Sequence, residues 1–150
     1  CQGVPEYEYD DSRVAQDMAA GLPEDVAAHV TVDHAFRKPE ALLSTLEGID
    51  AVISTRMHMA ILSLCKGVPV LPIAYERKTA DLFGTMGMSD LLLDIEDISP
   101  ETASATLAVL MQDLPGWQAR AARETLVLHD QALATADHLR AAFGGLVKQD

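Results

Sequence analysis

The stretch AVISTRMHMAILSLCKGVPVLPIAYERK, residues 51–78, decides the fold of this chain. It opens with a short apolar run, continues as a mostly apolar segment that ends at Gly67, and returns to a second apolar run, VPVLPIAY. Short β-branched runs are typical of buried strands, and glycine commonly follows the last turn of a helix. The stretch therefore predicts a strand at 50–55, a helix at 56–67 and a strand at 68–75, which is the βαβ order of a parallel sheet.

Two prolines lie in the second predicted strand, and proline cannot donate a hydrogen bond to a β-ladder. Pro69 lies near the start of the run and Pro72 near its end, where a missing donor is tolerated. The strand at 68–75 is therefore retained.

The rest of the chain alternates in the same way. Apolar periodicity predicts helices at 11–22, 38–49, 76–87, 100–113 and 116–143, and further strands at 28–36 and 91–95. Strands that alternate with helices indicate an α/β fold, with a parallel sheet flanked by helices. A length of 150 residues fits one α/β domain over 1–150.

The composition excludes several classes of protein. Hydrophobic residues make up 49% of the chain and charged residues 23%, which is ordinary for a globular domain. A net charge of −12 disfavours nucleic acid or an anionic membrane as partner, and no apolar run reaches the length of a transmembrane helix. With only Cys1 and Cys65, we expect no disulfide framework and a cytoplasmic location.

The charge is unevenly distributed. Residues 37–78 hold six bases against four acids, which gives this segment a charge of +2 inside an acidic chain. The bases are Arg37, Lys38, Arg56, Lys66, Arg77 and Lys78. Since parallel sheets bind ligands at the carboxyl ends of their strands, the polar residues that follow each strand are the candidate site residues. These are Asp33 and His34, then Ser54, Thr55, Arg56 and His58, then Tyr75 and Lys78.

The start of the helix at 56–67 is the best candidate for an anion site. Ser54 or Thr55 can cap its backbone donors, whose partial positive charge favours an anion. Arg56 adds a planar fork suited to carboxylate or phosphate, and His58 adds a general acid or base. Together these groups suit a small dianionic ligand.

Simpler interpretations stand beside this one. Arg56 is also compatible with a structural ion pair, and His58 with a structural hydrogen bond, which is the commoner role of a histidine at a helix start. Tyr75 and Lys78 are also compatible with a surface pair. Loop hydrogen bonds would also explain Asp33 and His34. The pairs His129–Asp130 and Asp137–His138 on the last helix fit a solvated helix face, and no metal site is expected.

The run from 49 to 78 resembles the polysaccharide pyruvyl transferase family, and the resemblance covers about residues 2–112 in outline. The family pattern has a strand ending in Ser-x-Arg-x-His, then Gly-Val-Pro-Val, then Tyr-x-x-Lys. All three parts occur here, as Ser54, Arg56 and His58, as Gly67-Val68-Pro69-Val70, and as Tyr75 and Lys78.

The resemblance implies a Rossmann-like parallel sheet similar to the C-terminal domain of a two-domain GT-B transferase. It implies that residues 1–150 are the C-terminal half of a longer enzyme. The implied reaction moves a pyruvyl group from phosphoenolpyruvate, the donor co-substrate, to a sugar of a cell-surface or extracellular polysaccharide as a ketal, with no further cofactor and no metal.

The resemblance also implies roles for individual residues. Arg56 would bind an acidic group of phosphoenolpyruvate, and His58 would be the catalytic acid or base. Ser54, Tyr75 and Lys78 would line the same substrate-binding cleft.

Two other functions remain as alternatives. The strand–helix–Gly-Val-Pro arrangement also occurs in donor domains of nucleotide-sugar-dependent glycosyltransferases, although Arg56 and His58 favour an acidic ligand. The chain could instead be non-catalytic and bury an exposed sheet edge in a homodimer. Its possible partners are therefore a second copy of the chain or an N-terminal domain outside it. The acceptor sugar and its linkage are not readable from these residues.

Overall fold

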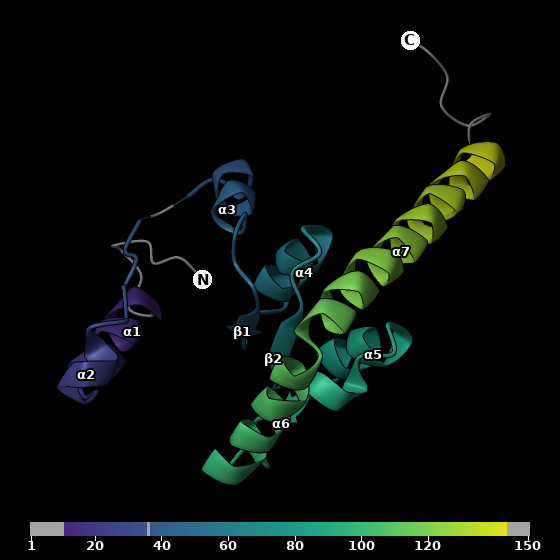
Figure 1. Ribbon diagram of the computed structural model, residues 1–150. Coiled ribbons are helices and arrows are strands. Elements are labelled where there is room, and N and C mark those ends of the chain that lie inside the picture. Colours follow the sequence, from purple (N-terminus) through teal and green to yellow (C-terminus); the bar gives the residue numbers. More distant parts are fainter. Residues whose placement is uncertain (1–10, 36, 144–150) are drawn as a thin grey trace. The chain divides into compact units, whose positions relative to one another are not determined.

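The computed structural model describes residues 11–35 and 37–143, which fall into two compact units divided after Thr45 (Figure 1). The first unit contains α1 (Asp11–Ala20), α2 (Glu24–Ala27) and α3 (Pro39–Thr45). The second contains β1 (Val52–Ser54), α4 (Met57–Cys65), β2 (Val70–Ala74), α5 (Arg77–Thr85), the 3₁₀ turn η1 (Ser89–Leu91), β3 (Leu93–Asp94), α6 (Pro100–Gln112) and α7 (Leu114–Phe143).

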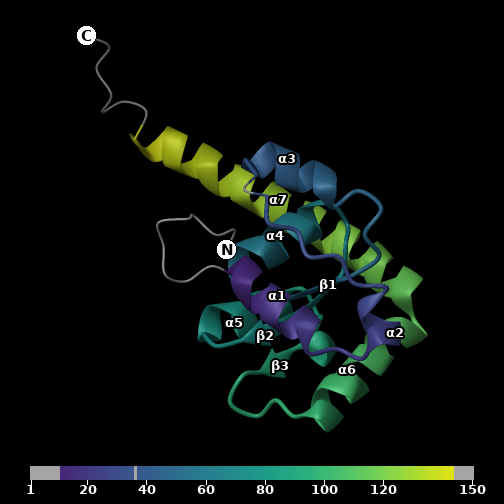
Figure 2. The same ribbon diagram turned by 90° about the vertical axis from the view of Figure 1, so that its left-hand side faces the viewer.

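The sheet of the second unit is parallel, with strand order β1-β2-β3. Val52 pairs with Val70 and Ser54 with Pro72, while Ala74 pairs with Asp94 on the other side (Figure 2). The crossovers α4 and α5 lie between these strands in the chain. The predicted α/β fold with a parallel sheet flanked by helices is therefore confirmed.

Pro72 lies in the middle of the central strand rather than near its end, and the ladder accommodates it. The Pro69 carbonyl accepts from Val52 of β1, whereas the Ala74 carbonyl accepts from Ile95 on the β3 side. Because neighbouring residues of a strand face opposite partners, Pro72 faces the β3 side. Pairing with β3 begins only at Ile73, so no β3 carbonyl loses a donor to Pro72.

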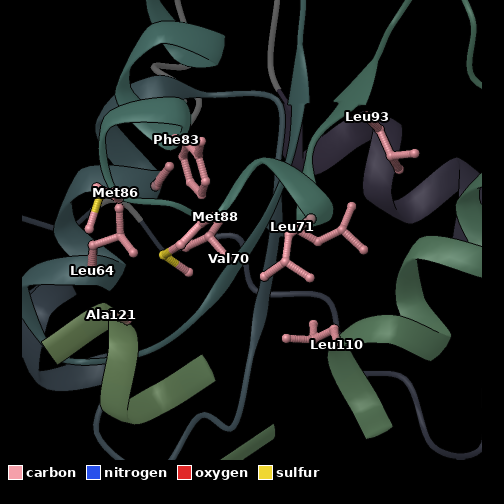
Figure 3. Packing of buried hydrophobic residues seen from close by; sticks show 11 residues of the cluster. Leu64, Val70, Leu71, Phe83, Met86, Met88, Leu93, Leu110 and Ala121 are labelled. Atoms are coloured by element: carbon pink, nitrogen blue, oxygen red, sulfur yellow. The ribbon is translucent and has the colours of Figure 1, made fainter. Parts of the chain in front are cut away.

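The core lies on both faces of β2. Val70 is 0% exposed and Leu71 1%, and their side chains point to opposite faces of the sheet. Figure 3 shows Phe83, Met86 and Met88 gathered near Val70, and Leu110 of α6 toward Leu71. A central strand buried on both faces is what a helix-covered parallel sheet requires.

The first half of α7 crosses the amino ends of the strands. The Gln118 amide donates to the Asp50 carbonyl before β1, the Thr125 hydroxyl to the Leu64 carbonyl of α4, and the Arg120 guanidinium to the Gly87 carbonyl before η1. Ala121 between them is fully buried. The second half of α7 runs on past the sheet, as Figure 1 shows.

The first unit differs from the sequence-based prediction at one element. Residues 28–35 form no strand, so the strand predicted at 28–36 is wrong over that range, and Phe36 lies outside the described residues. A strand needs a hydrogen-bonded neighbour, and the described part of this unit contains only helices and loops. Asp33 ends the extended segment in a turn, in which its Oδ1 accepts from the Ala35 amide at 2.9 Å.

Gly67, the glycine predicted to end α4, has φ +71. We expect Gly67→Ala to lower the free energy of unfolding by about 1–2 kcal/mol, because a Cβ disfavours this left-handed conformation. Urea denaturation followed by circular dichroism measures this change. Gly84→Ala is the matched control, since Gly84 lies inside α5 and the nearest atom to an added Cβ is 3.8 Å away. The control should be neutral or stabilising, and an equal loss in both variants would contradict the prediction.

Candidate functional site

The candidate site lies at the carboxyl edge of the sheet, opposite the edge that α7 crosses. At the end of β1, the Ser54 hydroxyl accepts from the Arg56 amide and donates to the Arg56 carbonyl, both at 3.0 Å. Arg56 has an extended backbone, with φ −96 and ψ 114, and is the N-cap residue directly before α4. The chain therefore passes from strand to helix in two residues.

The cap of α4 differs from the expected one. Arg56 occupies the N-cap position, and no side chain forms a cap hydrogen bond there within the part of the chain that the structure describes. Ser54, one of the two residues that could have capped the helix donors, instead bonds to the Arg56 backbone. The first turn of α4 thus keeps its partial positive charge at the carboxyl edge.

Arg56 immediately precedes the first residue of α4, Met57, and His58 immediately follows it. Arg56 is half-buried, while His58, the second residue of α4, is exposed. The helix itself is only partly buried. Ala60, Ser63 and Leu64 are buried, but Cys65 is an exposed free thiol, so α4 is not buried all round.

The next strand brings a second group of polar residues to the same edge. Tyr75 follows β2 directly and is 49% exposed, and Lys78 is the second residue of α5. The Glu76 carboxylate lies 2.5 Å from the Lys78 ammonium, and its hydrogen bond and charge raise the pKa of Lys78. Lys78 is therefore positively charged at neutral pH, and that charge is paired with the Glu76 carboxylate.

The sheet brings together the two predicted groups because β1 and β2 are neighbours. Ser54 ends one strand, and Arg56 and His58 follow it. Tyr75 and Lys78 follow the next strand, whose axis is about 5 Å away. The third strand ends at Asp94, whose Oδ1 accepts from the Glu96 amide at 2.9 Å. Sequence reasoning placed a strand there but did not include Asp94 among the edge residues, although an acid after a short apolar run was the available signal.

Asp33 and His34 belong to the first unit and do not follow a strand. The Ala35 amide and the Arg37 guanidinium hydrogen-bond to Asp33 and lower its pKa. A groove of about 490 Å³ in this unit runs between α1 and residues 30–33. Among the described residues its lining is mostly apolar, with two acids and no base, so these residues do not suit an anionic ligand.

The four residues of the two His–Asp sequence pairs are all exposed on the last helix. His129 lies 3.5 Å from Asp130, and Asp137 forms an ion pair with Arg140 at 2.8 Å. Over residues 11–35 and 37–143, no three His, Cys, Asp or Glu side chains are grouped as a metal site would need. Over the same ranges, every helix is too short or too polar to cross a lipid bilayer.

A parallel α/β sheet with basic and titratable side chains at its carboxyl edge has the arrangement in which open α/β sheets commonly bind ligands. Comparison with known proteins gives the family. The family model described as polysaccharide pyruvyl transferase matches residues 3–77, which include Ser54, Arg56, His58 and Tyr75. The chain belongs to the polysaccharide pyruvyl transferase family.

One curated relative is the amylovoran biosynthesis protein AmsJ of Erwinia amylovora, which is 30% identical over 98 residues. The aligned part is 65% of this chain and 23% of the relative, so the chain spans about a quarter of the length of that protein. No solved structure matches the chain.

Proposed function

We propose that this chain forms the phosphoenolpyruvate-binding part of a polysaccharide pyruvyl transferase that acts in exopolysaccharide biosynthesis. The family supports a transferase that modifies a polysaccharide, and the relative AmsJ is named for amylovoran biosynthesis. In this proposal the chain is the C-terminal, GT-B-like part of a longer cytoplasmic enzyme, and the acceptor is a sugar of the polysaccharide.

The observation that carries the proposal is the arrangement at the start of α4. A helix start without a side-chain cap, a half-buried arginine and an exposed histidine occur within three residues. Phosphoenolpyruvate has a carboxylate and a phosphate, which match an arginine fork and backbone N–H groups. Arg56 binds one acidic group of the donor, and Tyr75 and Lys78 approach it from the neighbouring strand.

The proposed reaction balances without a metal or a further cofactor. His58 delivers a proton to the terminal CH₂ carbon of phosphoenolpyruvate, which becomes a methyl group and leaves positive charge on the central carbon. Two hydroxyl oxygens of the sugar form bonds to that carbon, and the bond to the phosphate oxygen breaks. Of the two hydroxyl protons released, one replaces the proton that His58 gave and the other leaves with phosphate. The product is a pyruvate ketal.

Arg56→Ala is expected to raise the dissociation constant of phosphoenolpyruvate by about 10- to 100-fold, since hydrogen bonds to a charged partner contribute about 1.5–3 kcal/mol. Isothermal titration of phosphoenolpyruvate into the purified protein measures the change. Arg77→Ala is the matched control, because Arg77 lies at the same edge but its side chain is 91% exposed and pairs with Asp81.

Two results would contradict the proposal. One is a parent protein that does not bind phosphoenolpyruvate. The other is equal affinity in the parent and in Arg56→Ala. Tighter binding of a UDP- or GDP-sugar than of phosphoenolpyruvate would favour a glycosyltransferase donor domain instead.

A further inference from the structure

The Ser54 hydroxyl is engaged on both its donor and its acceptor side. Its oxygen accepts from the Arg56 amide at 3.0 Å, and its proton goes to the Arg56 carbonyl at 3.0 Å. The side chain is partly buried at the end of β1. Both bonds go to one residue, two positions further along the chain.

This arrangement limits what Ser54 can do for an anionic ligand. A serine hydroxyl has one O–H, and a contact with a phosphate or carboxylate oxygen requires that O–H as donor. In Ser54 it is already donated to the backbone. The role of substrate contact that the family resemblance implied for Ser54 would break this bond.

The same two bonds define the backbone at Arg56. Arg56 is the last extended residue before α4, and its carbonyl also accepts the first helical hydrogen bond, from Ala60 at 3.1 Å. A residue held at both its amide and its carbonyl has little freedom in φ and ψ, so the direction in which its side chain leaves the backbone is fixed as well.

We propose that Ser54 is a positioning residue for the donor site, which holds the Arg56 backbone so that the guanidinium is directed to the ligand. This inference rests on the proposed function, since it takes Arg56 as the group that binds the donor. Ser54 acts only through Arg56 and does not touch the donor.

The first test needs no ligand. Hydrogen exchange of the Arg56 amide, followed by NMR, should be about five- to tenfold faster in Ser54→Ala, which is the effect of losing one hydrogen bond. Ser54→Thr keeps the hydroxyl and should restore the parent rate. Thr55→Ala removes the hydroxyl of the next residue, which is exposed. In this variant too, the Arg56 amide should exchange at the parent rate. An Arg56 amide that is unaffected by Ser54→Ala would overturn the proposal.

The second test is a double-mutant cycle on phosphoenolpyruvate affinity. Ser54→Ala should raise the dissociation constant about five- to tenfold in the parent, and Ser54→Thr should rescue it. In the Arg56→Ala background, Ser54→Ala should have no further effect. An equal effect in both backgrounds would show that Ser54 contacts the donor independently, and would overturn the proposal.

The two tests separate this inference from the proposed function. A parent that does not bind phosphoenolpyruvate contradicts the proposed function, while the exchange rate of the Arg56 amide still decides whether Ser54 holds that backbone. A parent that binds phosphoenolpyruvate, together with unchanged exchange in Ser54→Ala, contradicts only the role of Ser54.

Discussion

Replacing His58 with glutamine is expected to lower the rate of the proposed pyruvyl transfer by about 10²- to 10⁴-fold, the range that a positioned general acid or base contributes. Glutamine keeps a polar side chain of similar reach but cannot deliver a proton to carbon. Because His58 is exposed, the thermal midpoint of unfolding should stay close to that of the parent. Phosphate release from phosphoenolpyruvate with a panel of hexopyranoside acceptors measures the rate.

His129→Gln is the matched control for this experiment. His129 is an exposed histidine on α7, and its side chain pairs with the neighbouring Asp130. The control should keep the parent rate, and both variants should bind phosphoenolpyruvate. A His58→Gln variant that retains most of the parent rate would contradict the assignment of His58 as the proton donor.

Phe83→Ala is expected to cost about 3–5 kcal/mol of unfolding free energy, a large part of the roughly 5–15 kcal/mol that stabilises a typical domain. Phe83 of α5 is fully buried and packs with Val70 of the central strand and with Met86 and Met88 (Figure 3). Its removal leaves a cavity that these neighbours fill only in part. Urea denaturation followed by circular dichroism measures the loss.

Leu133→Ala is the matched control for Phe83→Ala. Leu133 is a large apolar residue on α7 that is 53% exposed, so its truncation should change stability by less than about 0.5 kcal/mol. A loss below about 1 kcal/mol for Phe83→Ala, or equal losses in the two variants, would contradict the packing described for this core.

The elements of the second unit could be predicted because each has a local signal. The short apolar runs before Ser54 and Tyr75 became β1 and β2, and Gly67 marked the end of the helix between them. The strand predicted at 28–36 failed because a strand depends on a partner that its own residues do not reveal. Val30 and Val32 fit a strand pattern, but the described part of the first unit contains no strand beside residues 28–35.

The candidate site was predictable in outline but not in its contacts. The rule that ligands bind at the carboxyl ends of parallel strands selected the residues after β1 and β2, and the structure has both groups at that edge. The bond from Ser54 to Arg56 and the ion pair of Lys78 with Glu76 depend on side-chain rotamers. Rotamers follow from the three-dimensional packing, which residue spacing alone does not give.

The hydrogen bonds of α7 have a consequence for the evolution of this fold. Side chains of α7 donate hydrogen bonds to backbone carbonyls at the amino edge, from Gln118, Arg120 and Thr125. Every residue has a backbone carbonyl, so the acceptor does not depend on the side chain at the accepting position. These hydrogen bonds can therefore persist when the side chains of the accepting residues change. Substitutions at the opposite edge, where the donor site is proposed, leave these hydrogen bonds intact, so changes within the proposed site cost the scaffold little stability.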